Sequence, residues 1–257
     1  MALSDDQAFL DSQQYTRQSI ALYESIYGKD FVSPGGATVA RELIGRMGLP
    51  PSARVLDAGC GLGGSSFMMA SEFGFQVTGM DLSNNMLDIA MEKLATHGLE
   101  GRVELVNCDC SEIPASGSYD AVYSRDVFLH IHDKAKLFTA LYGALVEGGR
   151  LLFTDYCCGE KPWPADFQEY VEDRNYCLHT VDEYARLVEA AGFAEVMAED
   201  LTSRFTAILE RELETISGLG LADEKLASLE ASWKNKVERS RSGCHRWGLF
   251  SAIKPVS

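Results

Sequence analysis

Short apolar runs alternate with longer amphipathic stretches along most of this chain, beginning at Arg54. The runs have the length of buried strands, and the stretches between them repeat apolar residues with helical spacing. This alternation predicts an α/β fold with a mostly parallel seven-stranded sheet and helices on both faces. The expected strands are 55–58, 77–81, 103–107, 121–124, 151–155, 194–200 and 246–252, and the expected helices are 65–73, 86–97, 134–146 and 181–191.

Two regions fall outside this alternation. Residues 1–50 have the pattern of helices interrupted at Ser-Pro-Gly-Gly (33–36), and residues 156–179 are rich in tyrosine and charge. We therefore expect one domain, with an N-terminal helical lid at 1–50 and a core at 51–257 that carries a substrate-binding insertion at about 156–179. Ligands of open α/β sheets lie beyond the carboxyl ends of the strands, which is the edge that these extra segments are expected to cover.

The charge balance excludes some classes of partner. The 257 residues include 38 acidic and 23 basic side chains, which gives a formal net charge of −15. An acidic surface repels nucleic acid and anionic membranes, so we expect neither as a partner. A small anionic substrate stays possible if a few basic residues meet in one cleft.

The cysteines and the amino terminus indicate the compartment. The seven cysteines have no regular spacing and no zinc-site pattern, so we expect reduced thiols and no bound metal. The acidic start lacks the features of a signal peptide, and no stretch has the length of a transmembrane helix. We expect a cytosolic monomer.

A glycine-rich turn follows the first strand, with the sequence Val-Leu-Asp-Ala-Gly-Cys-Gly-Leu-Gly-Gly at 55–64. Gly59, Gly61 and Gly63 allow a ligand to approach the backbone. Their spacing differs from the dinucleotide fingerprint, in which two residues separate the second and third glycines. Asp57 precedes the turn, where its carboxylate would attract the ammonium of a methionine moiety and repel a pyrophosphate.

Two more carboxylates end the next strands. Asp81 is placed to accept bonds from both ribose hydroxyls, and Asp109 to meet an adenine amino group; we include the following residues, Leu82 and Cys110, in the expected cofactor site. Singly, each aspartate has an ordinary alternative as a turn former or helix cap. With the glycine turn, they predict S-adenosylmethionine as the cofactor, in the general class I methyltransferase pattern over about 50–155.

Six motifs carry a narrower resemblance. They are Gln-Tyr-Thr at 14–16, Ser-Pro-Gly-Gly at 33–36, the glycine turn, Tyr-Ser-Arg-Asp at 123–126 with His130, Thr-Asp-Tyr-Cys at 154–157 and Arg-Trp-Gly at 246–248. Together they closely resemble the phosphoethanolamine N-methyltransferases of parasites, nematodes and plants, over nearly the whole chain. The resemblance implies a Rossmann-like class I methyltransferase fold.

The same resemblance implies a role for individual residues. Tyr15 and His130 correspond to a hydrogen-bonded catalytic pair, and Asp126 to the residue that contacts the substrate nitrogen. Ser33 and Arg125 correspond to residues that line the cofactor and couple it to the lid. The phosphate is expected at Tyr156, Tyr170, Arg174, Tyr176 and Lys236, with Lys234 left open in place of Lys236. By position alone, Arg125 and Asp126 could instead form a surface ion pair, and His130 could cap a helix.

The expected activity is therefore S-adenosylmethionine-dependent N-methylation of phosphoethanolamine, or of its mono- and dimethyl derivatives, toward phosphocholine. One alternative is methylation of another small acceptor, such as a sterol carbon, a tocopherol-like ring or a glycine-type amine. A second is a protein that binds the cofactor without catalysis. A dinucleotide oxidoreductase is disfavoured by Asp57 and by the glycine spacing.

Overall fold

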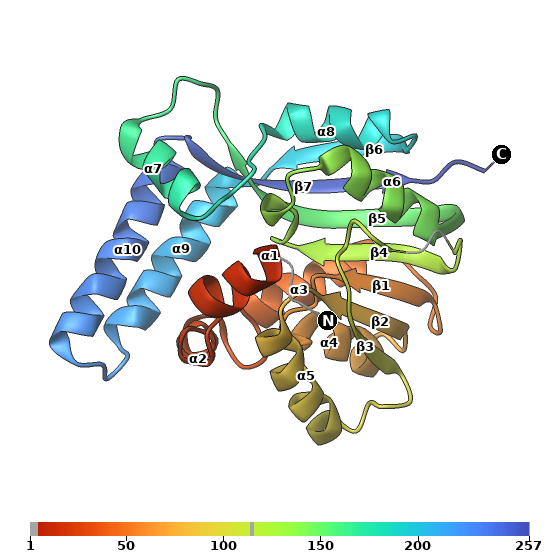
Figure 1. Ribbon diagram of the computed structural model, residues 1–257, viewed down its shortest axis with the longest axis horizontal. Coiled ribbons are helices and arrows are strands. Elements are labelled where there is room, and N and C mark those ends of the chain that lie inside the picture. Colours follow the sequence, from red (N-terminus) through yellow and green to blue (C-terminus); the bar gives the residue numbers. More distant parts are fainter. Residues whose placement is uncertain (1–4, 114–115, 257) are drawn as a thin grey trace.

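The computed structural model describes residues 5–113 and 116–256. Within them, seven strands form one sheet in the order β3-β2-β1-β4-β5-β7-β6 (Figure 1). All neighbouring pairs are parallel except those of β7, which runs antiparallel to β5 and β6, so the predicted mostly parallel sheet is confirmed. The strands are β1 (Arg54–Ala58), β2 (Gln76–Asp81), β3 (Val103–Asn107), β4 (Tyr119–Arg125), β5 (Leu145–Cys158), β6 (Ala194–Asp200) and β7 (His245–Ile253).

Helices cover both faces of the sheet, because successive side chains of a buried parallel strand point to opposite faces and both faces are apolar. Val55 packs toward α3 (Gly36–Arg46) and α4 (Gly64–Glu72), whereas the next residue, Leu56, packs toward α6 (Lys134–Ala144) and α8 (Val181–Ala190). The other helical elements are α1 (Asp5–Phe9), η1 (Leu10–Gln14), α2 (Arg17–Tyr27), α5 (Asn84–His97), η2 (Phe128–His130), α7 (Ala165–Asp173), α9 (Thr202–Ser217) and α10 (Asp223–Arg241).

The fifth strand differs from its predicted bounds. The helix expected at 134–146 ends at Ala144, because Leu145 turns to an extended backbone and pairs with Tyr119 of β4. At its other end β5 continues through Tyr156 to Cys158, where it pairs with the first residues of β7. The insertion expected from residue 156 therefore begins after Cys158, and Tyr156 is held by the sheet.

A helical hairpin of α9 and α10 connects β6 to β7 and was absent from the predicted elements. Its inner faces pack Phe205 and Leu209 of α9 and Trp233 and Val237 of α10 into the main core. Most other positions of α10 are polar and exposed, so α10 has a weak apolar period. It provides one wall of the candidate site.

Several segments gather beyond the carboxyl ends of the parallel strands. Figure 1 shows α1, α2, α7 and the α9–α10 hairpin on this side of the sheet. The third helix, α3, buries Val39, Leu43 and Ile44 in the core, so the part of the predicted lid that extends over the edge is residues 5–35, called the N-terminal segment below. The first four residues of the predicted lid lie outside the described part of the chain.

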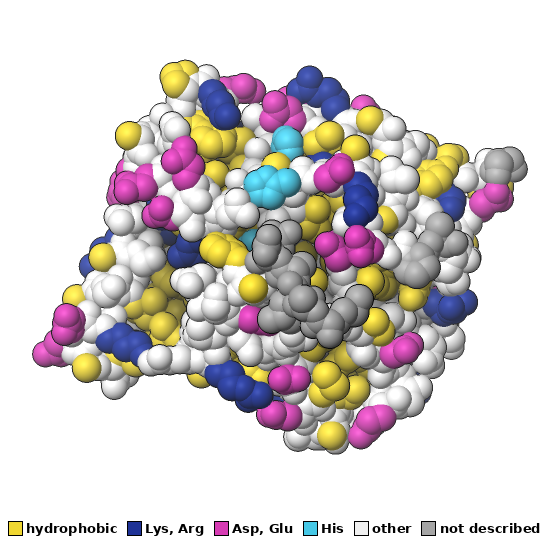
Figure 2. Space-filling model, in the orientation of Figure 1, with side chains coloured by type: hydrophobic (Ala, Val, Ile, Leu, Met, Phe, Trp, Pro, Cys, Tyr) yellow, Lys and Arg dark blue, Asp and Glu magenta, His cyan; other side chains and the backbone are white. Residues whose placement is uncertain are grey.

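The distribution of charged side chains on the surface offers no obvious site for a large anionic partner on the face that Figure 2 shows. Acidic and basic side chains are scattered over the face in Figure 2, with no continuous basic patch. Among the described residues, none of the helices has the length and apolar character needed to span a membrane.

Candidate functional site

A cavity of about 570 Å³ opens beyond the carboxyl ends of β1, β2 and β4. This volume is within the roughly 300–1,000 Å³ that is common for small-molecule sites. The cavity is lined by the N-terminal segment, the glycine turn, the ends of these strands, and parts of β5, α7 and α10. Every predicted site residue except Gly63 lines it.

The glycine turn forms one floor of the cavity. The backbone N–H groups of Gly59 and Cys60 each donate a 2.8 Å hydrogen bond to the carbonyl of Met80, which fixes the turn on β2. Gly59 has a φ of +81°, and a Cβ there would lie 2.3 Å from Cγ2 of Val127. The turn therefore requires glycine at this position, and its backbone is open to a ligand.

Gly63 is a predicted cofactor residue that does not line the cavity. It has a φ of +84° and begins α4, and a Cβ there would meet the ring of Phe67 in that helix. Gly64, one residue later, lines the cavity instead. The third glycine of the motif lets the turn enter the helix.

Three carboxylates stand at the glycine turn and along one side of the cavity. Asp57 accepts a 2.6 Å hydrogen bond from Ser66, and burial raises the pKa of Asp57 to about 7. Asp81 accepts bonds from the N–H groups of Gly61 and Ser83, and burial raises its pKa as well. Asp109 accepts one from the Ser111 N–H. Leu82 and Cys110 lie beside them in the cavity wall.

Removing carboxylates from water disfavours their charged form. A cation beside Asp57 would restore its negative charge, and ribose hydroxyls would donate to Asp81. Asp57, Asp81 and Asp109 are called the carboxylate end below.

Arg125 joins β4 to the N-terminal segment. Its guanidinium donates to the carbonyls of Pro34 at 2.6 Å and Gly36 at 3.1 Å, and the Ser33 hydroxyl donates to the Arg125 carbonyl at 3.5 Å. These are internal contacts, so the surface ion pair between Arg125 and Asp126 is wrong. The far part of the segment is held by Asp11, which accepts bonds from the Ser83 hydroxyl and the Asn85 N–H at the start of α5.

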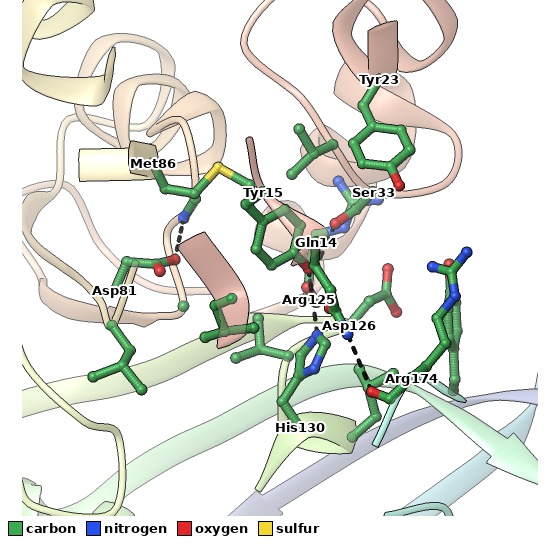
Figure 3. A pocket seen from close by; sticks show the side chains of 18 of the residues that line it. Gln14, Tyr15, Tyr23, Ser33, Asp81, Met86, Arg125, Asp126, His130 and Arg174 are labelled. Carbon is green, nitrogen blue, oxygen red and sulfur yellow. Dashed lines mark hydrogen bonds between the residues drawn. The ribbon is translucent and has the colours of Figure 1, made fainter. Parts of the chain in front are cut away.

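Tyr15, His130 and Asp126 occupy the middle of the cavity. Figure 3 shows Asp81 on one side of them and Arg174 on the other. The Tyr15 hydroxyl lies 3.3 Å from Nε2 of His130, and a hydrogen bond joins the two. Burial, with smaller effects of Lys134 and Arg174, lowers the pKa of His130 to about 4, whereas burial raises that of Tyr15. Both groups are therefore neutral at neutral pH.

Asp126 has one carboxylate oxygen held and one free. The residue has a φ of +57°, in the left-handed region that aspartate tolerates better than most residues. Its Oδ1 accepts bonds from the Trp247 indole at 2.7 Å and the Thr154 hydroxyl at 3.1 Å. Its Oδ2 is buried without a hydrogen-bond partner in the described chain, and burial raises the pKa of this carboxyl. A cationic donor in the cavity would satisfy Oδ2.

A cationic corner closes the far end of the cavity; it consists of Tyr156, Tyr170, Arg174, Tyr176 and Lys236. Lys236 donates a 2.7 Å hydrogen bond to the Tyr156 hydroxyl and lies 4.6 Å from the centroid of its ring. Burial, opposed by Glu212, lowers the pKa of Lys236 to about 8. Arg174 lies 5.4 Å from the ring centroid of Tyr170, which packs edge-on against Tyr176.

Lys234 is excluded from this corner. It lies on the exposed side of α10 and forms a 3.0 Å ion pair with Glu230, one turn away. Lys236 is therefore the lysine in the cavity, because two residues of helix turn the side chain to the other side of α10.

Some lining residues were not predicted. They include Gln14, whose side chain donates to the Arg174 carbonyl at 3.1 Å, and Tyr23 and Tyr27 of α2. The Gln-Tyr-Thr motif contains Gln14, so its position was available in the sequence. Trp247, the partner of Asp126, belongs to the Arg-Trp-Gly motif, but its contact with Asp126 depends on strand pairing. Arg239 depends on the hairpin, which local patterns did not indicate. No cluster of three or more metal-binding side chains occurs in residues 5–113 and 116–256.

Several known proteins are similar to this chain in sequence and fold. A family model described as a methyltransferase domain matches residues 55–149. Phosphoethanolamine N-methyltransferase of Plasmodium falciparum is 34% identical, over 98% of this chain and 97% of that protein. The chain belongs to the phosphoethanolamine N-methyltransferase family. Phosphoethanolamine N-methyltransferase 1 of Arabidopsis thaliana is 39% identical over 96% of this chain, and this chain spans about half, 52%, of that relative.

A solved structure of the family has the same fold. Haemonchus contortus phosphoethanolamine N-methyltransferase 2, in complex with phosphomonomethylethanolamine and S-adenosylhomocysteine, superposes with a TM-score of 0.93 at 36% identity. The superposition covers 99% of this chain and 61% of that one. The class I methyltransferase fold predicted from the sequence is therefore confirmed.

Proposed function

We propose that this protein transfers methyl groups from S-adenosylmethionine to the nitrogen of phosphoethanolamine or of its mono- and dimethyl derivatives. One observation carries the proposal: a single cavity is lined by a carboxylate end, by a cationic corner and, between them, by Asp126, whose Oδ2 has no hydrogen-bond partner in the described chain. A phosphobase has a cationic nitrogen and a dianionic phosphate, and this arrangement complements both. The relative solved with phosphomonomethylethanolamine and S-adenosylhomocysteine supports it.

The carboxylate end fits the cofactor. Asp57 would accept the ammonium of its methionine part, and Asp81 and Asp109 the ribose hydroxyls and the adenine amino group. Gly59 and Gly61 line the cavity beside these carboxylates, so the backbone of the glycine turn would contact the ligand. When bound, S-adenosylmethionine supplies an electrophilic methyl group.

The substrate is oriented by its two ends. Arg174, Lys236 and the tyrosine hydroxyls bind the phosphate with charge-assisted hydrogen bonds, which are short and strong. Oδ2 of Asp126 accepts a hydrogen bond from the nitrogen and favours its positive charge. Fixing both ends directs the nitrogen toward the donor, and such alignment supplies a large part of the acceleration in a two-substrate reaction.

The nitrogen must lose a proton before it is nucleophilic. His130 is neutral at neutral pH and lies in the same cavity, so its imidazole accepts this proton. The negative charges of a bound phosphate raise the pKa of His130 from its low value in the free protein. Tyr15 orients the imidazole through their hydrogen bond, and the N-terminal segment excludes water from the site.

The compartment, the oligomeric state and the role of the N-terminal segment are also predicted. We infer a cytosolic monomer in which residues 5–35 act as a lid on a single domain.

A methyl-transfer assay tests the function. Phosphoethanolamine and its mono- and dimethyl derivatives are offered separately with S-adenosylmethionine, beside ethanolamine, glycine and a sterol. We expect turnover of at least one phosphobase, inhibition by phosphocholine, and no turnover of acceptors without a phosphate. Efficient methylation of an uncharged acceptor alone would refute the proposal, and cofactor binding without any methyl transfer would indicate a non-catalytic protein.

A further inference from the structure

A third cation lies at the cationic corner. Arg239 of α10 lines the same cavity as Arg174 and Lys236. Its guanidinium carbon lies 3.9 Å from the ring centroid of Tyr170, the ring that Arg174 approaches from 5.4 Å. Arg239 and Lys236 are three residues apart on one helix, so both side chains reach the cavity from the same side of α10.

These cations have no acidic counterpart. Within the described ranges, Arg174, Lys236 and Arg239 form no ion pair with a carboxylate, whereas Arg241, two residues beyond Arg239, pairs with Glu210 at 2.7 Å. Glu212 and, more weakly, Asp126 are the acids whose charges act on Lys236, and neither forms an ion pair with it. The two oxygens of Glu212 already accept bonds from the Gly35 N–H and the Trp233 indole. The protein carries a net charge of −15, yet this corner holds unpaired positive charge.

The guanidinium of Arg239 can donate a further hydrogen bond. Its Nε is buried and lacks a partner in the described chain, and such a group costs free energy until an acceptor arrives. The groups facing Arg239 are Tyr170, Arg174, Lys236 and His245, and none of them is an anion at neutral pH. His245 is buried beneath the tyrosines, and burial holds its pKa well below the usual range, so it stays neutral.

We propose that Arg239 is a further phosphate-binding residue and that it makes the site select the dianionic form of a phosphate monoester over the monoanion. The inference rests on the proposed function, because it assigns a specificity residue to the same substrate. Stacking on Tyr170 limits the motion of the guanidinium, and a planar fork of N–H groups matches the geometry of phosphate oxygens. With Arg174 and Lys236, Arg239 brings three positive charges to the corner, and their attraction is stronger for a dianion than for a monoanion.

Steady-state kinetics of Arg239→Gln test this between pH 5.5 and 7.5, the interval that contains the second ionisation of a phosphate monoester at about pH 6. We expect a KM for the phosphobase about tenfold or more above wild type at pH 7.5, with kcat within about threefold. The wild-type KM rises as the pH falls and the dianion is lost, and this rise should shrink in the variant. Arg241→Gln, on the exposed side of the same helix, is the matched control and should follow wild type.

A second variant separates charge from packing. Arg239→Lys keeps the charge but loses the planar stack on Tyr170, so it should retain the wild-type pH dependence of KM. If Arg239→Gln raised KM by the same factor at every pH, Arg239 would merely support Tyr170, and the inference would be wrong. An unchanged KM would also overturn it.

Calorimetric titration with phosphocholine makes the test independent of turnover. Wild type should bind this probe at least about tenfold more tightly than Arg239→Gln at pH 7.5, and Arg241→Gln should match wild type. If wild type bound phosphocholine but methylated no phosphobase, the proposed function would fail and the role of Arg239 would stand. If wild type did not bind it, both would fail.

Discussion

The indole nitrogen of Trp247 donates a 2.7 Å hydrogen bond to Oδ1 of Asp126. This bond runs from the antiparallel strand β7 to the turn that ends β4, and it fixes one carboxylate oxygen, while the other is buried without a hydrogen-bond partner in the described chain. The strand at the far end of the sequence thus sets the orientation of the group that we assign to the substrate nitrogen.

The charge of Asp126 is therefore testable without disturbing the turn. Asp126→Asn keeps the shape of the side chain, and asparagine also tolerates the left-handed backbone at this position. Loss of a charged hydrogen bond is worth about 1.5–3 kcal/mol, so we expect kcat/KM for the phosphobase to fall by roughly 10- to 100-fold. Steady-state kinetics measure this change, with little change in melting temperature.

Asp120→Asn is the control for this substitution. Asp120 lies on the same strand and accepts a bond from the Arg54 N–H, which an amide oxygen can also accept. Its kinetics should match wild type. Equal activity of Asp126→Asn and wild type would remove Asp126 from the site.

Replacement of His130 separates chemistry from cofactor binding. Removing a general base commonly costs roughly 10²–10⁴ in rate, so His130→Gln should lower kcat by at least about 100-fold. The dissociation constant for S-adenosylmethionine, measured by calorimetry, should stay within about threefold. Tyr15→Phe removes the hydroxyl that bonds to Nε2 and should give a smaller loss in kcat.

His179→Gln is the matched control, because His179 is partly buried and lies outside the cavity. It should keep wild-type turnover. Parallel losses of turnover and cofactor affinity in His130→Gln would indicate a structural role for His130.

Loss of the positive charge of Lys236 should weaken substrate binding at alkaline pH. Its pKa is lowered from 10.5 to about 8, chiefly by burial, so the side chain is charged below about pH 8 and loses its charge above it. The KM for the phosphobase should therefore rise above pH 8, by at most about tenfold per pH unit. Arginine stays charged throughout this range, so Lys236→Arg should abolish the rise.

The neighbouring Lys234 provides the control, since it is exposed and paired with Glu230. Lys234→Arg should reproduce the wild-type profile of KM against pH. A wild-type KM that stayed constant from pH 7 to 9.5 would contradict the assignment of Lys236 to the phosphate.

Gly59→Ala tests the backbone of the glycine turn. The added Cβ would lie 2.3 Å from Cγ2 of Val127, at a φ of +81° that alanine rarely adopts. We expect a loss of S-adenosylmethionine affinity of at least about tenfold and a lower melting temperature. Gly101→Ala meets open space and should change neither quantity.

The sequence predicted the sheet and the carboxylate end well, because both depend on local patterns. Each strand of the parallel core is a short apolar run, and Asp57, Asp81 and Asp109 come at or just after the carboxyl ends of such runs. Parallel strands bring these ends to one edge of the sheet, so adjacency in space followed from the fold class. The contact between Tyr15 and His130 was expected from the family resemblance, since 115 residues separate them in the chain.

The α9–α10 hairpin was not predicted, although α9 buries Phe205, Ile208, Leu209 and Ile216 at helical spacing. The residues of α10 explain why the second helix was missed. Over the 19 residues of α10, Trp233, Val237 and Ser240 are buried, which is too few for a clear helical period. Lys234 and Lys236 could not be separated from the local sequence, because the direction of each side chain depends on how the hairpin docks. The role of Trp247 depends on strand pairing with β5, which sequence periodicity does not specify.

The N-terminal segment is fastened at both ends to loops that belong to the site. Asp11 bonds to Ser83 and Asn85, next to Asp81, and Pro34 accepts from Arg125, next to Asp126. Seating of the segment and occupancy of the cavity depend on the same loops, so we expect each to favour the other, and linkage makes the two effects equal in factor. The rate of protease cleavage within residues 5–35 should therefore fall as the fraction of protein with ligand bound in the cavity rises.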